Sequence, residues 1–300
     1  MIVITLDSHI LSKIANDTVL FEKIYKKTEQ LYISGKLIFQ FSPIVFIESL
    51  KGVKTKEHFK EDQNRVRIAS KLCNKHFLPD TANHLRKTIG LNSEKDAFRI
   101  GCNWIRRFHD IATCDTFEAF TIQHLPFFAK LGGRIEENHK SMSHSLIQLK
   151  KYLHKDAYKT EEFMDTLRRT FLDIAIDHFD LKSALALTRM SINEVAKSLP
   201  GLTFFSFSYA SLVKDCLDPQ GRKEIIASDY CDMIQTVYLD VCDYIVSNDS
   251  RFARVVNSSG LKELEKRIIP FEEFLSMLDF LNDAKKAPLN PSFLSIPPQQ

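Results

Sequence analysis

Short apolar runs bounded by polar residues predict the strands of this chain. They occupy residues 2–6, 37–41, 244–246 and 267–271. Continuous apolar runs of this length, without the alternation of a half-exposed sheet, are typical of strands covered on both faces in a parallel sheet. Pro270 lies in the last run, and because proline cannot donate a hydrogen bond to a ladder, we expect this strand at the edge of the sheet.

Helical patterns separate the first two strands and follow the second. Residues 11–34 carry apolar side chains at helical spacing and end next to Gly35, a residue that favours a helix end. Residues 44–50 form another apolar segment behind Ser42 and Pro43, a typical N-cap and first-turn pair. Strand, helix, strand and helix in this order predict a right-handed βαβ unit in a parallel sheet.

The middle of the chain has helical periodicity only. Prolines and glycines mark breaks near 77–80, 131–133 and 199–201. No period of the solenoid kind is present. The predicted helices are 55–76, 93–125, 143–155, 160–179 and 181–198.

The stretch 228–252 predicts a helix followed by a strand. Ser228 is a suitable N-cap, and apolar residues recur behind it at three- and four-residue steps, which predicts one buried helix face. The members of this face are Tyr230, Ile234, Val237, Tyr238 and Val241. Later helices are predicted at 252–256, 261–266 and 272–281.

Together these elements predict an α/β fold in which helices sandwich a parallel sheet. Residues 1–50 and 216–282 form the predicted α/β core, and residues 51–215 form a large all-helical insertion. The segment 283–300, with four prolines among polar residues, is predicted to be a disordered tail.

Charge is distributed unevenly along the chain. The net charge is only +3, from 41 basic and 38 acidic residues. Residues 51–215 hold 27 Lys and Arg against 20 Asp and Glu, whereas the two flanking segments together hold 14 against 18. A basic insertion beside acidic flanks suits a metal site next to a surface for a polyanion, although solvated helix faces explain the same numbers.

Composition also bounds the environment of the protein. The six cysteines form no CxxC pair and lie mostly in apolar runs, as expected for buried free thiols in a reducing compartment. The first residues lack the regions of a signal peptide, and no apolar run approaches the length of a membrane span. We therefore expect a cytoplasmic protein without a membrane partner.

Four acidic residues lie where these elements would bring them together. Asp7 and Asp249 end the runs at 2–6 and 244–246, and Glu48 and Asp232 lie near the starts of helices. Carboxyl ends of parallel strands share one edge of a sheet, where α/β folds bind their ligands. Clustered carboxylates repel one another, and a divalent cation removes that cost; an all-oxygen site suits Mg²⁺ or Mn²⁺.

Each acid also has a purely structural interpretation. Asp7 can be the N-cap of the following helix, and Asp232 can compensate a helix dipole. Asp229 competes with Asp232 as the third acid, and Asp243 is interpreted as structural. Glu48 lies in so apolar a segment that it is expected to have a partner.

Five segments of the chain resemble the PIN-domain family of metal-dependent nucleases. They are residues 4–8, 41–48, 232–235, 246–252 and 268–275. The resemblance implies a three-layer PIN-like core with Asp7, Glu48, Asp232 and Asp249 as an acidic quartet. It also implies an endoribonuclease with Mg²⁺ or Mn²⁺ as cofactor and single-stranded RNA as partner. Because some members are toxins of toxin–antitoxin pairs, an antitoxin or a second copy of the chain is a further expected partner.

Two other functions remain open at this point. A PIN-like module that binds nucleic acid or protein without catalysis is the main alternative. A phosphatase of the α/β type is disfavoured because Asp7-Ser8-His9 lacks a second aspartate two residues after the first.

The segment around Trp104 has two interpretations. Trp104, Phe108, Arg106 and Arg107 can stack on bases and bind phosphates of single-stranded RNA. The helical spacing of Trp104 and Phe108 favours a place in the hydrophobic core. Ser247 and Asn248 similarly suit either a turn or a water ligand.

Overall fold

The structure is a computed structural model of the whole chain. It describes residues 1–74, 77–79, 81–90, 94–152, 159–179, 181–182, 185, 191–218, 220–221, 224–257 and 259–283. The predicted tail from 284 onward and parts of the predicted helices 143–155 and 181–198 lie outside these residues.

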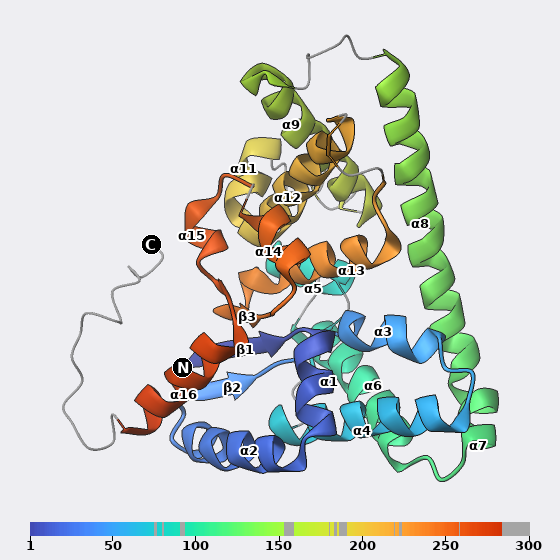
Figure 1. Cartoon of the computed structure of the whole chain (residues 1–300), viewed down its shortest axis with the longest axis vertical. Helices are drawn as coiled ribbons and strands as arrows, with labels where there is room; N and C mark the ends of the chain where they lie inside the picture. Colours follow the sequence, from blue (N-terminus) through green and yellow to red (C-terminus); the bar gives the residue numbers. More distant parts are fainter. Residues whose placement is uncertain are drawn as a thin grey trace.

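A small parallel sheet of four strands lies within a mostly helical chain (Figure 1). The strand order is β2-β1-β3-β4, and every pair is parallel. The strands are β1 (Ile2–Leu6), β2 (Leu37–Phe39), β3 (Tyr244–Val246) and β4 (Ile268–Ile269). All four apolar runs are thus confirmed as strands, and β4 lies at the edge, as Pro270 predicted. The α/β class and the parallel sheet are confirmed.

Two helices, not one, connect β1 and β2. They are α1 (Ser8–Asn16) and α2 (Thr18–Ile33), so the single helix predicted at 11–34 was wrong. Asp17 separates them because its backbone is extended and its Oδ1 accepts the Leu20 N–H at 2.9 Å, which caps α2. After β2, α3 (Ile44–Lys51) begins as predicted, and the Ser42 hydroxyl oxygen accepts the Ile44 N–H at 3.1 Å.

The segment between α3 and the second half of the sheet is helical, as predicted. Its helices are α4 (Lys56–Leu72), α5 (Thr81–Thr88), α6 (Glu94–Thr113), α7 (Phe117–Gln123), α8 (Leu125–Tyr152), α9 (Glu161–His178), α11 (Ile192–Ser198) and α12 (Pro200–Leu217). The helix predicted at 93–125 is two helices, and α5 and α12 were missed. Figure 1 shows α8 along one side of the molecule, from α7 up to the level of α9.

The break predicted at 131–133 was wrong, because α8 continues through it. A Cβ atom on Gly132 would lie 2.1 Å from Cδ of Lys51, so this glycine allows α8 to approach α3 closely. The Lys51 ammonium forms an ion pair with Glu136 of α8, with an N–O distance of 3.0 Å. A glycine that serves helix packing has the same appearance in a sequence as a glycine that ends a helix.

The last part of the chain supplies the other half of the sheet and its helices. They are α13 (Ala227–Gln235), the 3₁₀ helix η2 (Thr236–Asp240), α14 (Ser250–Val256), α15 (Lys262–Glu265) and α16 (Phe271–Asp283). Ser228 is not the N-cap of α13; instead, Asp229 Oδ2 accepts the Ile226 N–H at 2.8 Å. The predicted face of this helix is buried except for Val241, which follows the end of η2 and is exposed.

One continuous hydrophobic cluster joins the sheet with the helices of both parts of the chain. α12 packs against α9, η2 and α14, and α3 packs against α8 and α13. The division into residues 1–50 with 216–282 and an insertion at 51–215 therefore stays a prediction from the sequence. Among the residues that the structure describes, no helix combines the length and the apolar character that a membrane span requires.

The described cysteines lie outside disulfide bonds, as the prediction of thiols requires. Cys73, Cys216, Cys231 and Cys242 are buried and Cys114 is half-buried. The side chain of Cys102 lies outside the described residues.

Candidate active site at the carboxyl edge of the sheet

Asp7 lies at the carboxyl end of β1 and is almost fully buried, with 5% of its surface exposed. Its backbone N–H donates to the Val246 carbonyl at 3.1 Å and so continues the ladder with β3. Its carboxylate Oδ1 accepts the Ile10 N–H at 2.7 Å, which makes Asp7 the N-cap of α1. The structural interpretation of Asp7 is thus confirmed, and it leaves the second carboxylate oxygen outside the cap.

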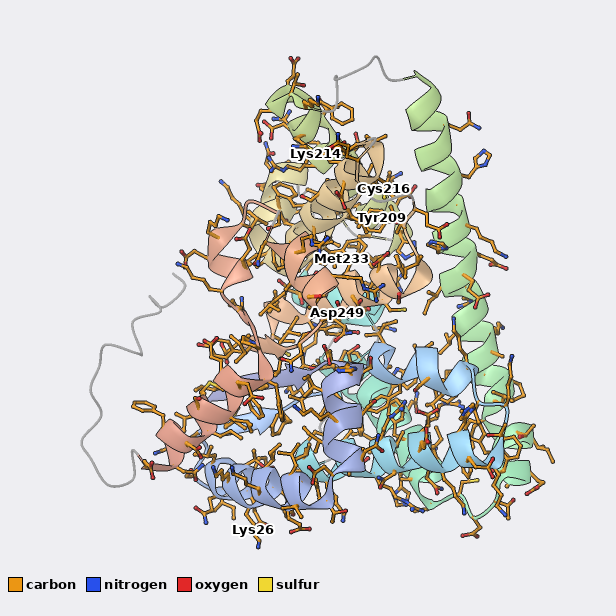
Figure 2. All side chains as sticks on the ribbon, viewed as in Figure 1. Lys26, Tyr209, Lys214, Cys216, Met233 and Asp249 are labelled. Carbon is orange, nitrogen blue, oxygen red and sulfur yellow. The ribbon has the colours of Figure 1, made fainter. Side chains whose placement is uncertain are left out.

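Asp249 lies just beyond the neighbouring strand β3. Its Oδ1 accepts the N–H groups of Arg251 at 2.7 Å and Phe252 at 3.2 Å, so it is the N-cap of α14. Its side chain is 27% exposed. In Figure 2, Asp249 lies between α13 and α14 on one side and β1 on the other.

Ser247 connects the two aspartates. The register pairs Leu6 with Val246, so the residues that follow them, Asp7 and Ser247, emerge side by side. The Ser247 side chain hydrogen-bonds to the Asp7 carboxyl group. The Ser247 hydroxyl oxygen also accepts the Asp249 N–H at 3.1 Å. Ser247 therefore forms the turn predicted for it and, in addition, holds Asp7 and Asp249 at one place on the sheet edge.

The two aspartates differ in their electrostatics, because Asp249 Oδ2 forms an ion pair with the Arg251 guanidinium at 3.7 Å, whereas burial has the largest effect on Asp7. Burial raises the pKa of Asp7 above its ordinary value, and the nearby charge of Asp249 adds to this rise. Hydrogen bonds from Ile10 and Ser247, and the charge of His9, lower the same pKa. Desolvation is the largest of these effects, so a cation placed beside Asp7 would stabilise its charged form.

The other two predicted acids have different positions. Asp232 lies on α13 and is partly exposed; α13 packs against both α3 and α14. Glu48 lies on α3, and its side chain is outside the described residues. Asp229, the competitor of Asp232, is buried and caps the start of α13. Asp243 is structural, as predicted, because its Oδ2 accepts the Val3 N–H at 2.7 Å.

Within the described part of the chain, no group of three or more His, Cys, Asp or Glu side chains is close enough to hold a metal ion. The structure therefore brings Asp7 and Asp249 together but does not add Asp232 to a three-ligand group. The donor chemistry still fits Mg²⁺ or Mn²⁺, because Mg²⁺ is commonly held by one or two carboxylates together with waters and substrate phosphates. Carboxylate and hydroxyl oxygens are the donors at this edge.

A second polar pair was missed by the sequence analysis. His84 of α5 and Asp240 of η2 face each other at 3.9 Å between Nε2 and Oδ2, and both side chains are only 2% exposed. Burial raises the pKa of Asp240 to about 7 and lowers the pKa of His84 to about 4. No local pattern marks either residue, because the contact joins distant parts of the chain.

Comparison with known proteins adds no relative to this picture. No protein-family model matches the chain, and neither the curated proteins nor the solved structures contain a match. The resemblance to PIN-domain nucleases therefore rests on the sequence segments alone.

Proposed function

We propose that this protein is a metal-dependent endoribonuclease with a PIN-like core, which hydrolyses RNA phosphodiester bonds at the carboxyl edge of the sheet. The observation that supports this proposal most strongly is the pair Asp7 and Asp249. The two carboxylates end adjacent parallel strands, share Ser247 as a partner, and include a buried acid whose pKa is raised by burial.

Asp7 and Asp249 would hold Mg²⁺ or Mn²⁺, with Asp232 and Glu48 as further ligands predicted from the sequence. When bound, the ion supplies positive charge to the phosphate oxygens and lowers the pKa of water. In the hydrolysis a water molecule releases a proton as its oxygen bonds to phosphorus, the bridging P–O bond breaks, and the leaving oxygen takes up a proton. The chain's own contribution is orientation: backbone N–H groups and Ser247 hold both carboxylates in place.

The test is cleavage of a labelled, mixed-sequence single-stranded RNA in Mn²⁺, in Mg²⁺ and in EDTA. We expect cleavage with either ion and none in EDTA. Asp7→Asn and Asp249→Asn should each lower the rate by about 100-fold or more, since loss of a ligand costs at least as much as loss of a residue that orients one. Asparagine keeps the Oδ1 acceptor that caps each helix, so both variants are expected to fold.

Asp17→Asn is the matched control. Asp17 caps α2 as Asp7 caps α1, with Oδ1 accepting the N–H three residues on at 2.9 Å, but it is exposed and outside the sheet edge. Its substitution should leave the rate unchanged. Full activity in both site variants would disprove the assignment, and RNA binding without cleavage under any condition would favour the non-catalytic binding module.

A further inference from the structure

A basic cleft of about 850 Å³ lies between α3, α5, α6 and the start of α8, and neither Asp7 nor Asp249 lines it. Three arginines line it: Arg106 and Arg107 from α6 and Arg134 from α8. Asp110 is the one acidic side chain among the described residues of the lining. The cleft therefore carries an excess of positive charge over a wide, open volume.

The arginines differ in how far they are already engaged. Arg107 lies over the ring of Phe127, with 3.6 Å from its guanidinium carbon to the ring centroid, and burial lowers its pKa. Arg106 and Arg134 are exposed, and in the described part of the chain neither forms an ion pair with a carboxylate. Two guanidinium groups are thus available to an anionic ligand, and planar guanidinium groups bind phosphate oxygens in a bidentate manner.

Neutral hydrogen-bonding groups surround these charges. The exposed side chains of Asn103 and Gln123 line the cleft. His124 also lines it, with 6% of its surface exposed and no hydrogen-bond partner for Nδ1 among the described residues. Trp104 is buried against Phe108, with ring centroids 5.5 Å apart, so it forms a wall and is not free to stack on a base.

The cleft shares a helix, α3, with one of the four predicted acids. Ile47 of α3 lines the cleft and directly precedes Glu48. The same helix packs against α13, which carries Asp232, and against α8, which carries Arg134. An extended phosphate-bearing strand in the cleft would therefore run beside α3, the helix that carries Glu48 and packs against the helix of Asp232.

We propose that this cleft binds consecutive phosphates of a single-stranded RNA through Arg106 and Arg134, while Arg107, held over Phe127, adds positive charge to the cleft. The choice of RNA rests on the proposed function, whereas the binding itself needs no cleavage. Amides of Asn103 and Gln123 supply contacts to sugars or base edges, and phosphates supply the affinity.

The experiment is fluorescence anisotropy of a labelled single-stranded oligoribonucleotide with the full-length protein in EDTA, over a series of salt concentrations. Arg106→Gln and Arg134→Gln should each weaken binding roughly fivefold and reduce the steepness of log K against log salt by about 0.7, as expected for one lost phosphate contact. Arg169→Gln is the charge-matched control, because Arg169 is exposed on α9 and does not line the cleft. Unchanged melting temperatures would show that the variants fold.

Each outcome of this experiment either supports or overturns the proposed RNA binding. Weaker binding in both cleft variants, with the control unchanged, supports it even if the protein never cleaves RNA, in which case only the nuclease proposal fails. Wild-type affinity in both variants, or no binding by the wild type, overturns it without affecting a cleavage result. Competition by a 5′-mononucleotide or inorganic phosphate as effective as that by unlabelled RNA would assign the cleft to a free phosphate ligand and also overturn it.

Discussion

Burial raises the pKa of both Asp7 and Asp240, but the two carboxyl groups have different surroundings. Asp7 follows the carboxyl end of β1 and lies beside the partly exposed carboxylate of Asp249. Asp240 is enclosed: its Oδ1 accepts the Gly201 N–H at 2.7 Å, and its Oδ2, 3.9 Å from His84 Nε2, has no hydrogen-bond partner among the described residues. The same physical effect therefore marks a predicted ligand site in one case and a structural cost in the other.

At this scale we predict that Asp240→Asn becomes increasingly stabilising as pH rises. The pKa of Asp240 in the folded protein is about 7, above the ordinary value of 3.8, so the folded state binds the proton more tightly and loses stability as pH rises toward 7. Asparagine keeps the acceptor for Gly201 and has no charge to bury. The unfolding free energy of the variant relative to wild type should grow by about 2–3 kcal/mol from about pH 5 to about pH 8.

The measurement is urea unfolding at several pH values. As a control, the same comparison is made in protein that carries His84→Gln. Desolvation, the Gly201 hydrogen bond and Arg267 set the pKa of Asp240, and His84 is not among the causes. The gain in unfolding free energy from Asp240→Asn should grow with pH by the same amount with and without His84. A difference between variant and wild type that stays constant across this pH range would contradict the burial of an uncharged Asp240.

At the scale of elements, close helix approach depends on two glycines. Gly132 allows α8 to meet Lys51 of α3, and Gly201 allows α12 to meet η2. A Cβ atom on Gly201 would lie 2.4 Å from the Val237 carbonyl oxygen, an atom of the backbone that cannot move independently. Gly133, next to the first of these, has nothing within 4 Å of its Cβ position.

We therefore expect opposite effects from two alanine substitutions. Gly201→Ala should destabilise the protein by about 1–3 kcal/mol, the usual cost of overpacking. Gly133→Ala should be neutral or stabilise it by up to about 1 kcal/mol, because alanine is the better helix former and meets no neighbour. Thermal unfolding of the two variants measures both. An equal effect of the two substitutions would show that α12 does not approach η2 as closely as described.

At this scale, the sequence predicted the features that a local pattern of residues determines. The apolar runs became strands, and the acid after each central strand, Asp7 and Asp249, came to the same edge because strand polarity is enough to place it. The predictions failed where a contact between residues far apart in the sequence determines the structure. Gly132 was predicted to end a helix, although it serves a contact with Lys51, and α12 was missed although most of its residues are buried. His84 and Asp240 meet only in the folded chain.

In the whole molecule, α3 contributes Ile47 to the arginine-lined cleft and packs against α13, which carries Asp232. The acidic pair lies at the sheet edge, and the arginine-lined cleft lies between α3, α6 and α8, within the segment that the sequence marked as basic. Trp104 was favoured as a core residue and is buried, whereas Arg106 and Arg107 line the cleft. The sequence thus singled out Arg106 and Arg107, which are neighbours on α6, but not Arg134, because Arg134 comes from a different helix.

The most direct test of the central claim is a Mn²⁺ titration followed by electron paramagnetic resonance of the free ion, with no RNA present. The wild type should remove Mn²⁺ from solution in a saturable manner. Asp7→Asn and Asp249→Asn should each weaken the affinity by about 10- to 100-fold or more, and Asp17→Asn should not change it. Equal Mn²⁺ binding by wild type and both site variants, or none by any of them, would contradict a metal site at Asp7 and Asp249.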